Sequence, residues 1–453
     1  MFFLVQIYEV AKLFFEKLRI PSIHLLYSIR CRFSHSSVKM KQMGNEGSEA
    51  MDIRGRWISA KQMETRLSTH QLIPAVTFTC QRCGAFPVKG PCTCGKRCYY
   101  CRQCIAYGKL RTCDQLITDT RPLDPVRPAQ HRPVRLTPAQ TTVARTIEQT
   151  ILRGGRLLVH AVCGAGKTPM FFPGIERALA NGKRVLVTAP RADVVRELTH
   201  HIKQAFPTAH VVSLYGGSAD RLLLGEITVS TTHQLIHYRS CFDVVLLDEV
   251  DAFPFHMNWT LHRYVKRAMT QKAALILLSA TPSMWHRRYP TVRLMRRYHG
   301  HPLPVPRLKS PFTMQSIVEW LRQYEQQPRL VFVPRIAALE AWQTRLKEVG
   351  IDVTTVHAED PDRIEKIQAF RTTNGILLTT TILERGVTIS NVQVAVLDAD
   401  QGFSTKALIQ ISGRVGRDAA YPDGDISFFA NDRSDALFYA IHQIQKANRW
   451  TTS

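Results

Sequence analysis

The sequence predicts an α/β fold in which two tandem domains, each built on a parallel β-sheet, follow a small cysteine-rich module. Three observations lead to this prediction. Apolar segments of strand length alternate with amphipathic segments of helix length, which is typical of βαβ units. Eight of the 11 cysteines lie between Cys80 and Cys113. Four short motifs follow in a fixed order: AVCGAGKT (161–168), DEVD (248–251), SAT (279–281) and QISGRVGR (410–417).

The composition indicates a globular protein with a polyanionic partner. A chain of 453 residues suits two or three domains, and an apolar fraction of 45% argues against wholesale disorder. The charge is unusual, because 60 Lys and Arg residues face only 36 Asp and Glu residues and give a formal net charge of +24. Such an excess favours nucleic acid or another polyanion as the partner.

Residues 1–29 are mostly apolar, but Glu9, Lys12 and Glu16 interrupt them at helical spacing. This pattern argues against a transmembrane span, and a signal peptide would carry its charges before the apolar stretch. Two interpretations of this stretch remain: an amphipathic helix at a membrane surface, or translation from a non-native upstream start. We therefore expect residues 1–70 to form an N-terminal segment that is partly disordered or non-native. The candidate later starts are Met40, Met43 and Met51.

The cysteines have the spacing of a zinc site. Two C-x2-C knuckles separated by a loop can aim four sulfurs at one point, as tetrahedral Zn²⁺ requires. A disulfide framework fits badly, since the rest of the chain is typical of a reducing compartment. The favoured ligands are Cys80, Cys83, Cys101 and Cys104.

Other assignments of the cysteines stay open. Cys98 can replace Cys104 as the partner of Cys101. A second ion held by Cys92 and Cys94 is a weaker alternative, because a C-x-C pair has a less favourable bite. One zinc per chain is the expectation.

Basic and aromatic residues are interleaved with these cysteines. Charges that meet phosphates beside rings that stack on bases predict a surface for single-stranded nucleic acid, although a purely structural staple is the alternative. The residues are Arg82, Lys89, Lys96, Arg97, Arg102, Lys109 and Arg111, with Tyr99, Tyr100 and Tyr107. We expect a four-cysteine zinc module at 71–118, a linker at 119–135, a first domain at 136–300 and a second at 301–453, with a hinge at 296–309.

The first motif predicts a phosphate-binding loop between a buried strand and a helix. Its glycines let backbone N–H groups close on phosphate oxygens. Lys167 is expected to contact the β- and γ-phosphates and Thr168 to bind Mg²⁺. Pro169 is unexpected, because it removes an amide that often faces the α-phosphate. The predicted nucleotide-binding residues are Gln140, Ala161, Gly164, Ala165, Gly166, Lys167, Thr168, Asp248 and Gly386, with Gln140 at the adenine edge.

The remaining motifs predict catalysis. Asp248 is expected to hold Mg²⁺ through water, and Glu249 to orient or deprotonate the attacking water. Asp251 is expected to couple to the SAT loop. Arg414 and Arg417 are expected one helical turn apart and pointing one way, where permanent guanidinium charges suit a γ-phosphate in its transition state. The alternative for this pair is a solvated helix face.

Residues at the carboxyl ends of predicted strands would meet a nucleic-acid backbone. These are Pro190, Arg191, Gly216, Thr231, Thr232 and Thr379–Thr381.

Together the motifs are typical of superfamily 2 helicases, which hold ATP between two RecA-like domains. Over residues 70–450 the chain resembles the ComFA family, through its cysteine module and the segments PRADVVREL, LYGGS, DEVDAFP, RRYHGHPLPVP, TTTILERGVT and QISGRVGR. The resemblance implies an ATPase that drives import of single-stranded DNA during natural transformation at the cytoplasmic face of the membrane. It also implies a ComFC-like partner and a ComEC-like channel. The departures are Pro169, the surplus cysteines and the long N-terminus.

Two other functions are compatible with the sequence. A PriA-like restart helicase also combines cysteines with two RecA-like domains, but such proteins are longer and carry the cysteines within the second domain. A zinc-dependent DNA-binding adaptor would use ATP only as a switch. A homo-oligomer is compatible with any of these functions.

Overall fold

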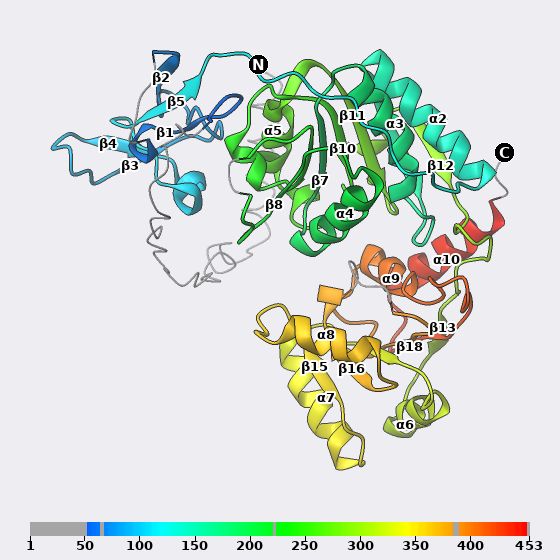
Figure 1. The fold of residues 1–453 in the computed structure, drawn as a ribbon. Coiled ribbons are helices and arrows are strands. Elements are labelled where there is room, and N and C mark those ends of the chain that lie inside the picture. The colour runs from blue at the N-terminus through cyan, green and yellow to red at the C-terminus, as the bar shows by residue number, and fades with distance from the viewer. Residues whose placement is uncertain (1–51, 64–67, 221–222, 384–388, 451–453) are drawn as a thin grey trace. The chain divides into compact units, whose positions relative to one another are not determined.

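The computed structural model describes residues 52–63, 68–220, 223–383 and 389–450. The predictions for the first 51 residues and for Gly386 lie outside the described residues. The predicted α/β class with two parallel sheets is confirmed (Figure 1).

The first domain is built on a seven-stranded sheet in which every neighbouring pair is parallel. Its strands form because short apolar runs are buried on both faces of a parallel sheet. In sheet order they are β12 (Thr291–Leu294), β6 (Arg156–Ala161), β11 (Met269–Ser279), β10 (Phe242–Leu247), β7 (Val185–Ala189), β9 (Ile227–Thr231) and β8 (Val211–Leu214).

Four α-helices accompany this sheet: α2 (Pro138–Arg153), α3 (Phe172–Ala180), α4 (Ala192–Ala205) and α5 (Trp259–Ala268). Side chains alternate along each strand, so neighbouring residues enter different cores. Val187 and Leu246 join the core that contains α2, α3 and α4, whereas Leu186 and Val245 join the core that contains α5 and the cysteine module. The module is therefore packed into the same hydrophobic core as one face of the sheet.

The second domain is built on a six-stranded parallel sheet. The strands are, in order, β13 (Arg307–Lys309), β18 (Ile426–Phe429), β17 (Gln393–Val396), β14 (Arg329–Phe332), β16 (Ile376–Thr379) and β15 (Thr354–Val356). The helices are α6 (Met314–Gln323), α7 (Ile336–Glu348), α8 (Arg363–Arg371), α9 (Thr405–Ser412) and α10 (Asp435–Arg449). The same alternation produces two cores, one with α8, α9 and α10 and the other with α6 and α7.

The cysteine module contains two small antiparallel sheets. One has the order β1-β5-β2, and the other pairs β3 with β4. The strands are β1 (Ile58–Ser59), β2 (His70–Pro74), β3 (Val88–Gly90), β4 (Cys98–Tyr100) and β5 (Gln115–Asp119). The module starts before the boundary predicted at residue 71, because β1 pairs with β5 and Ile53 and Ile58 share a core with Ile117.

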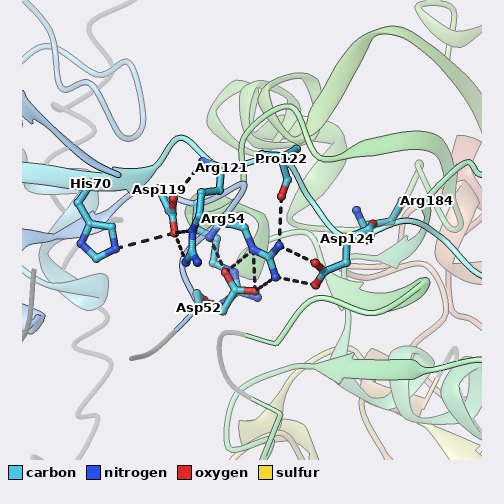
Figure 2. A network of polar contacts seen from close by, with 9 residues as sticks. Asp52, Arg54, His70, Asp119, Arg121, Pro122, Asp124 and Arg184 are labelled. Atoms are coloured by element: carbon cyan, nitrogen blue, oxygen red, sulfur yellow. Dashed lines mark hydrogen bonds and ion pairs between the residues drawn. The ribbon is translucent and has the colours of Figure 1, made fainter. Parts of the chain in front are cut away.

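Ion pairs attach the start of this module to the chain that leads into the first domain (Figure 2). The guanidinium of Arg54 donates to both carboxylate oxygens of Asp52 and, at 2.6 Å each, to both of Asp124. Arg184 donates in turn to the carbonyl oxygen of Asp124 at 3.0 Å. Burial alone would raise the pKa of Asp119, but hydrogen bonds from Arg121 lower it to about 2. These carboxylates are therefore charged near neutral pH and hold the segment in place.

Among the described residues, no helix is both long and apolar enough to cross a membrane.

Candidate nucleotide and metal sites

The phosphate-binding loop follows β6, as predicted. Gly164 and Gly166 have φ angles of +77° and +66°, which side chains rarely adopt. A Cβ atom at residue 166 would also lie 2.5 Å from Nε2 of Gln140. Both glycines are therefore required by the path of the loop. Ala161 lies fully buried at the end of β6, behind the loop.

Gln140 supports this loop from behind. Its side-chain amide donates to the carbonyl oxygens of Ala165 at 2.9 Å and Gly166 at 3.2 Å. Its Oε1 atom accepts from the amide of Thr137 at 2.9 Å, which closes a capping box at the start of α2. The observed contacts hold the loop, and the adenine contact of Gln140 stays a prediction.

A cavity of about 660 Å³ opens in front of the loop. Lys167 and Thr168 line it, together with the backbone of the loop. The helix after the loop does not start as an α-helix. Residues Thr168–Phe171 form a 3-10 turn with Pro169 in its first turn, and α3 begins only at Phe172. Proline is tolerated there because its missing N–H has no intrahelical partner.

Two acids from the end of β10 face the same cavity. Asp248 and Glu249 both line it, and Asp248 Oδ1 accepts the amide of Glu249 at 2.8 Å. Glu249 has a φ of +52°, an uncommon conformation for a residue with a side chain. Such conformations persist where the surrounding structure enforces them, and they cluster at functional sites. The loop thus brings both carboxyl groups to the phosphate-binding residues.

The expected coupling of Asp251 to the SAT motif is confirmed. Ser279 Oγ donates to one carboxylate oxygen of Asp251 at 2.6 Å, and Thr281 Oγ1 donates to the other at 2.7 Å. All three side chains are buried, so these bonds form where water does not compete. The loops that follow β10 and β11 are therefore linked rigidly.

The expectation for the two arginines was wrong in geometry. Helix α9 ends at Ser412, and Arg414 lies in the turn that follows, where Gly416 has a φ of +65°. The two side chains consequently differ in surroundings. Arg417 lines the cavity and donates to the carbonyl oxygen of Gly413 at 2.8 Å, whereas Arg414 is 2% exposed and is not among the residues that line the cavity.

The surroundings of Arg414 disfavour its charge. Burial, and next the positive charge of Arg417, lower the pKa of Arg414 well below its usual range, while the negative charge of Glu249 acts in the opposite direction. A guanidinium nevertheless stays protonated in proteins.

Contacts between the two domains border the cavity, and the sequence did not identify them. The thiol of Cys163 donates to Oε1 of Gln410 at 3.1 Å, and Gln410 also lines the cavity. A Cβ atom at residue 413 would lie 2.3 Å from Cβ of Cys163, so this approach requires Gly413. The only sequence signal was the glycine in the motif that carries the arginines.

Arg297 is a second connection, within the segment predicted as the hinge. It is 3% exposed and donates to the carbonyl oxygens of Val415 at 2.9 Å, Pro422 at 2.8 Å and Gly416. His299 contacts the carbonyl oxygen of Gly416 at 3.0 Å. The segment therefore holds the turn that carries Arg417.

Several residues expected at a nucleic-acid backbone are buried instead. Thr231, Thr232, Thr379 and Thr380 are all at most 9% exposed, and Thr379 Oγ1 donates to the carbonyl oxygen of Val356 at 2.9 Å. Thr231 and Thr379 are the last residues of β9 and β16, and Thr232 and Thr380 follow them directly, so all four lie at the buried ends of strands in parallel sheets. Arg191 donates to Asp193 at 2.7 Å and to the carbonyl oxygen of Ile382, in the second domain, at 2.6 Å. Gly216 is exposed and Thr381 partly exposed.

The four favoured cysteines converge. All four Sγ atoms lie within 4.8 Å of one another, with Cys83 and Cys101 at 3.3 Å and Cys80 and Cys104 at 3.7 Å. Zn–S bonds of about 2.3 Å in a tetrahedron place sulfurs about 3.8 Å apart. These residues therefore fit a Zn²⁺ ion.

Arg82 belongs to the surroundings of this cluster and not to the exposed surface predicted for it. It is 1% exposed, its Nε–H donates to Cys104 Sγ at 3.4 Å, and its Nη2 donates to the carbonyl oxygen of Gly108 at 2.6 Å. The alternative ligand Cys98 lies elsewhere, 3.3 Å from Cys94. The structure thus places Cys98 and Cys101 in different groups of cysteines, and not in one site as the alternative pairing required.

Comparisons with known proteins agree with this architecture. The family described as the competence protein ComFA N-terminal domain matches residues 52–118. The DEAD/DEAH box helicase family matches residues 137–288, and the helicase conserved C-terminal domain matches residues 313–419. Two RecA-like domains thus follow the cysteine module.

Curated relatives cover most of the chain. The competence protein ComFA of Bacillus subtilis is 37% identical over 403 residues, 82% of this chain and 86% of that protein. ComFA of Streptococcus pneumoniae is 33% identical over 374 residues, 78% of this chain and 86% of that protein. Saccharomyces cerevisiae Dbp5 bound to RNA and ADP BeF3 shares the fold, with a TM-score of 0.51, 18% identity and coverage of 69% of this chain and 92% of that one.

These matches also settle the class of enzyme. A DEAD/DEAH domain followed by a helicase C-terminal domain identifies an ATP-hydrolysing superfamily 2 helicase that uses ATP and Mg²⁺ and binds nucleic acid. The extent and level of identity decide among the members of that superfamily. The chain belongs to the ComFA family of competence-associated helicases.

Proposed function

We propose that this chain is a motor that moves along single-stranded DNA and draws it into the cell during natural transformation. One observation carries the proposal: the cavity is lined by Lys167 and Glu249 of the first domain and by Arg417 of the second. A nucleotide in this cavity would contact both domains. Its hydrolysis would then change how the domains hold each other, which is what translocation along a strand needs.

We assign roles from the chemistry of each side chain. Lys167 and the loop amides hold the phosphates, and Thr168 with Asp248 would hold Mg²⁺. When bound, the metal neutralises charge on the phosphates. Glu249 orients the attacking water and accepts its proton, and Arg417 stabilises the charge that develops on the transferred phosphoryl group. Arg414 contributes positive potential from a buried position. The link from Asp251 to Ser279 and Thr281 transmits the state of the acidic loop to the neighbouring loop.

The DNA path is proposed to follow the exposed loops and the module. Lys89, Arg102 and Lys109 are exposed in the module, and the ammonium of Lys109 lies 4.2 Å from the ring centre of Tyr100. Exposed cations beside aromatic rings suit phosphates and bases of a single strand. Zinc at Cys80, Cys83, Cys101 and Cys104 would fold the part of the module that carries them. Action at the inner membrane face with a ComFC-like protein and a ComEC-like channel completes the proposal.

ATP turnover with and without single-stranded DNA tests the motor. We expect the DNA to stimulate turnover at least about tenfold, and the protein to use ATP to displace streptavidin from the biotinylated end of a single strand. Lys167→Ala removes the charge that holds the phosphates, and Glu249→Gln keeps binding but stops hydrolysis. Both variants should abolish turnover. An unstimulated protein that binds DNA and ATP but displaces no streptavidin would be an adaptor with an ATP switch.

A further inference from the structure

The structure contains a second cluster of four cysteines. Cys92, Cys94, Cys98 and Cys113 bring their Sγ atoms within 4.8 Å of one another. Cys94 and Cys98 are 3.3 Å apart, and Cys92 and Cys113 are 3.5 Å apart. These distances match those in the first cluster, and both are close to the separation of about 3.8 Å for sulfurs around tetrahedral Zn²⁺.

The ligand set resolves the objection to a C-x-C pair. Taken alone, Cys92 and Cys94 form a C-x-C pair with an unfavourable bite. In the structure Cys92 lies 3.5 Å from Cys113, and Cys94 lies 3.3 Å from Cys98 at the start of β4. Cys113 joins from a turn 21 residues away from Cys92. A set drawn from three segments can surround an ion.

The hairpin has little support of its own beyond backbone contacts of β4 with residues 110–112. Strands β3 and β4 pair over three residues, and every residue of the connection 91–97 except Cys92 is exposed. A two-stranded hairpin is marginally stable in water, and small modules without a core commonly depend on metal or disulfides. The convergence of four thiols at the loop end of this hairpin, where Gly90 pairs with Cys98, supplies such a support.

Disulfides explain the cluster less well. Two disulfides would need only two sulfur pairs, whereas here all four sulfurs lie around one point. The S···S distances of 3.3 and 3.5 Å also exceed the length of about 2.05 Å for an S–S bond.

Four thiolates around Zn²⁺ carry a net charge of −2. Three basic residues lie within two residues of a ligand in the chain: Lys96, Arg97 and Arg111.

We propose that Cys92, Cys94, Cys98 and Cys113 bind a second Zn²⁺ ion that fixes the β3–β4 hairpin. All eight cysteines between Cys80 and Cys113 then serve as ligands, and the chain holds two zinc ions. The hairpin carries Lys89, Tyr99 and Tyr100, so the second ion also fixes part of the surface proposed for DNA.

Metal analysis of the full-length protein, purified under reducing conditions, tests this proposal. We expect two zinc ions per chain in the parent protein and one in the double variant Cys92→Ser/Cys113→Ser. Cys241→Ala is the matched control: it removes a buried cysteine outside both clusters and should leave two ions. Zinc content that the double variant leaves unchanged would overturn the proposal.

A ligand-preserving variant protects the test against misfolding. Cys94→His keeps a donor that binds zinc, so the protein should still take up two equivalents of Co²⁺. One of the two sites should then change its absorption from that of four sulfurs to that of three sulfurs and one nitrogen. An unchanged Co²⁺ spectrum, or a mass deficit of two hydrogens per pair in unreduced protein, would contradict a metal site. Neither result bears on ATP turnover, so the motor proposal is tested separately.

Discussion

At the scale of single residues, Arg414 and Arg417 carry the same guanidinium group but have different surroundings. Arg417 reaches the cavity from a turn, and Arg414 is enclosed behind it. A charge that is buried next to a like charge is stabilised by an incoming anion. We therefore propose that Arg414 adds to the positive potential of the site and that Arg417, which lines the cavity, contacts the reacting phosphate.

Arg417→Ala should lower ATP turnover on the order of 10³-fold at saturating ATP with little change in KM, because an arginine that stabilises the transition state acts on turnover. Steady-state kinetics measure both quantities. Arg433→Ala, an exposed arginine of the same domain, is the control and should behave like the parent. A raised KM with intact turnover would instead make Arg417 a ground-state binding contact.

His237 should make the protein sensitive to acid. Burial, and then the charges of Arg82 and Arg56, lower the pKa of His237 to about 4, below its ordinary value of about 6.5. Between these two values the unfolded chain binds a proton that the folded chain does not. Its contribution to stability is therefore present above pH 6.5 and is lost as the pH falls toward 4.

His237→Phe should remove about 2 kcal/mol of the difference in stability between pH 7.5 and pH 5, since one pKa unit corresponds to about 1.4 kcal/mol and pH 5 lies about 1.5 units below the unfolded value. The ring of His237 lies 6.0 Å from that of Tyr107, an aromatic contact that phenylalanine can replace. Denaturant unfolding at pH 7.5 and pH 5 provides the measurement, with exposed His256→Gln as the control. An unchanged difference between the two pH values in His237→Phe would contradict the assignment.

At the scale of elements, the sequence predicted what local pattern determines. Buried strands and the glycine-rich loop were predicted because apolar runs and positive φ angles leave marks in the sequence. The end of α9 was not predicted, since QISGRVGR has helical spacing but Gly416 takes a left-handed conformation in the turn after Ser412. The burial of Thr379 was also missed, because it depends on neighbouring strands.

The two clusters of cysteines also differ in whether local sequence pattern or tertiary structure determines them. The first cluster was predicted because two C-x2-C turns are visible in the sequence. A second ion was only a weaker alternative with Cys92 and Cys94, because the pairing of β3 with β4 and the isolated bridge between Tyr100 and Arg111 are what bring Cys113 to Cys92. Contacts of this kind are set by tertiary structure.

The turn after α9 should tolerate no side chain at residue 413. Gly413 has a φ of −69°, so alanine fits the backbone, but its Cβ would lie 2.3 Å from Cβ of Cys163. Overpacking costs about 1–3 kcal/mol, so Gly413→Ala should lower ATP turnover on the order of tenfold. Cys163→Gly removes the clashing atom and should restore most of the activity in the double variant.

The control for this pair is Gly375→Ala, which is in the same domain and meets nothing closer than Thr373 Oγ1 at 3.4 Å. It should leave turnover unchanged. Failure of Cys163→Gly to rescue Gly413→Ala would show that the loss does not arise from the contact between these two residues.

At the scale of the whole molecule, hydrogen bonds between described residues join the two domains. Arg297 binds the turn that carries Arg417, Arg191 donates to the carbonyl oxygen of Ile382, and Cys163 binds Gln410. In the segment between the domains, the amide and the carbonyl oxygen of Leu303 bind the side chain of Asn448 at 2.8 and 2.9 Å. All of these are hydrogen bonds between neutral groups or from a guanidinium to a carbonyl oxygen. Such contacts can exchange without a large change in free energy. A nucleotide that binds both domains can therefore shift their arrangement.

The excess of positive charge should show itself in the salt dependence of DNA binding. For single strands, the slope of log K against log salt is about −0.7 for each phosphate that the protein neutralises. Arg102→Gln and Lys109→Gln, which remove exposed charges of the module, should each make the slope less negative by about 0.7. Arg153→Gln, which removes an exposed charge at the end of α2, is the control.

Backbone contacts carry no sequence information, so homopolymer and mixed strands should bind alike. Fluorescence anisotropy at several salt concentrations measures both properties. A strong preference for one sequence, or slopes that the module variants leave unchanged, would show that the strand does not follow the path proposed for it.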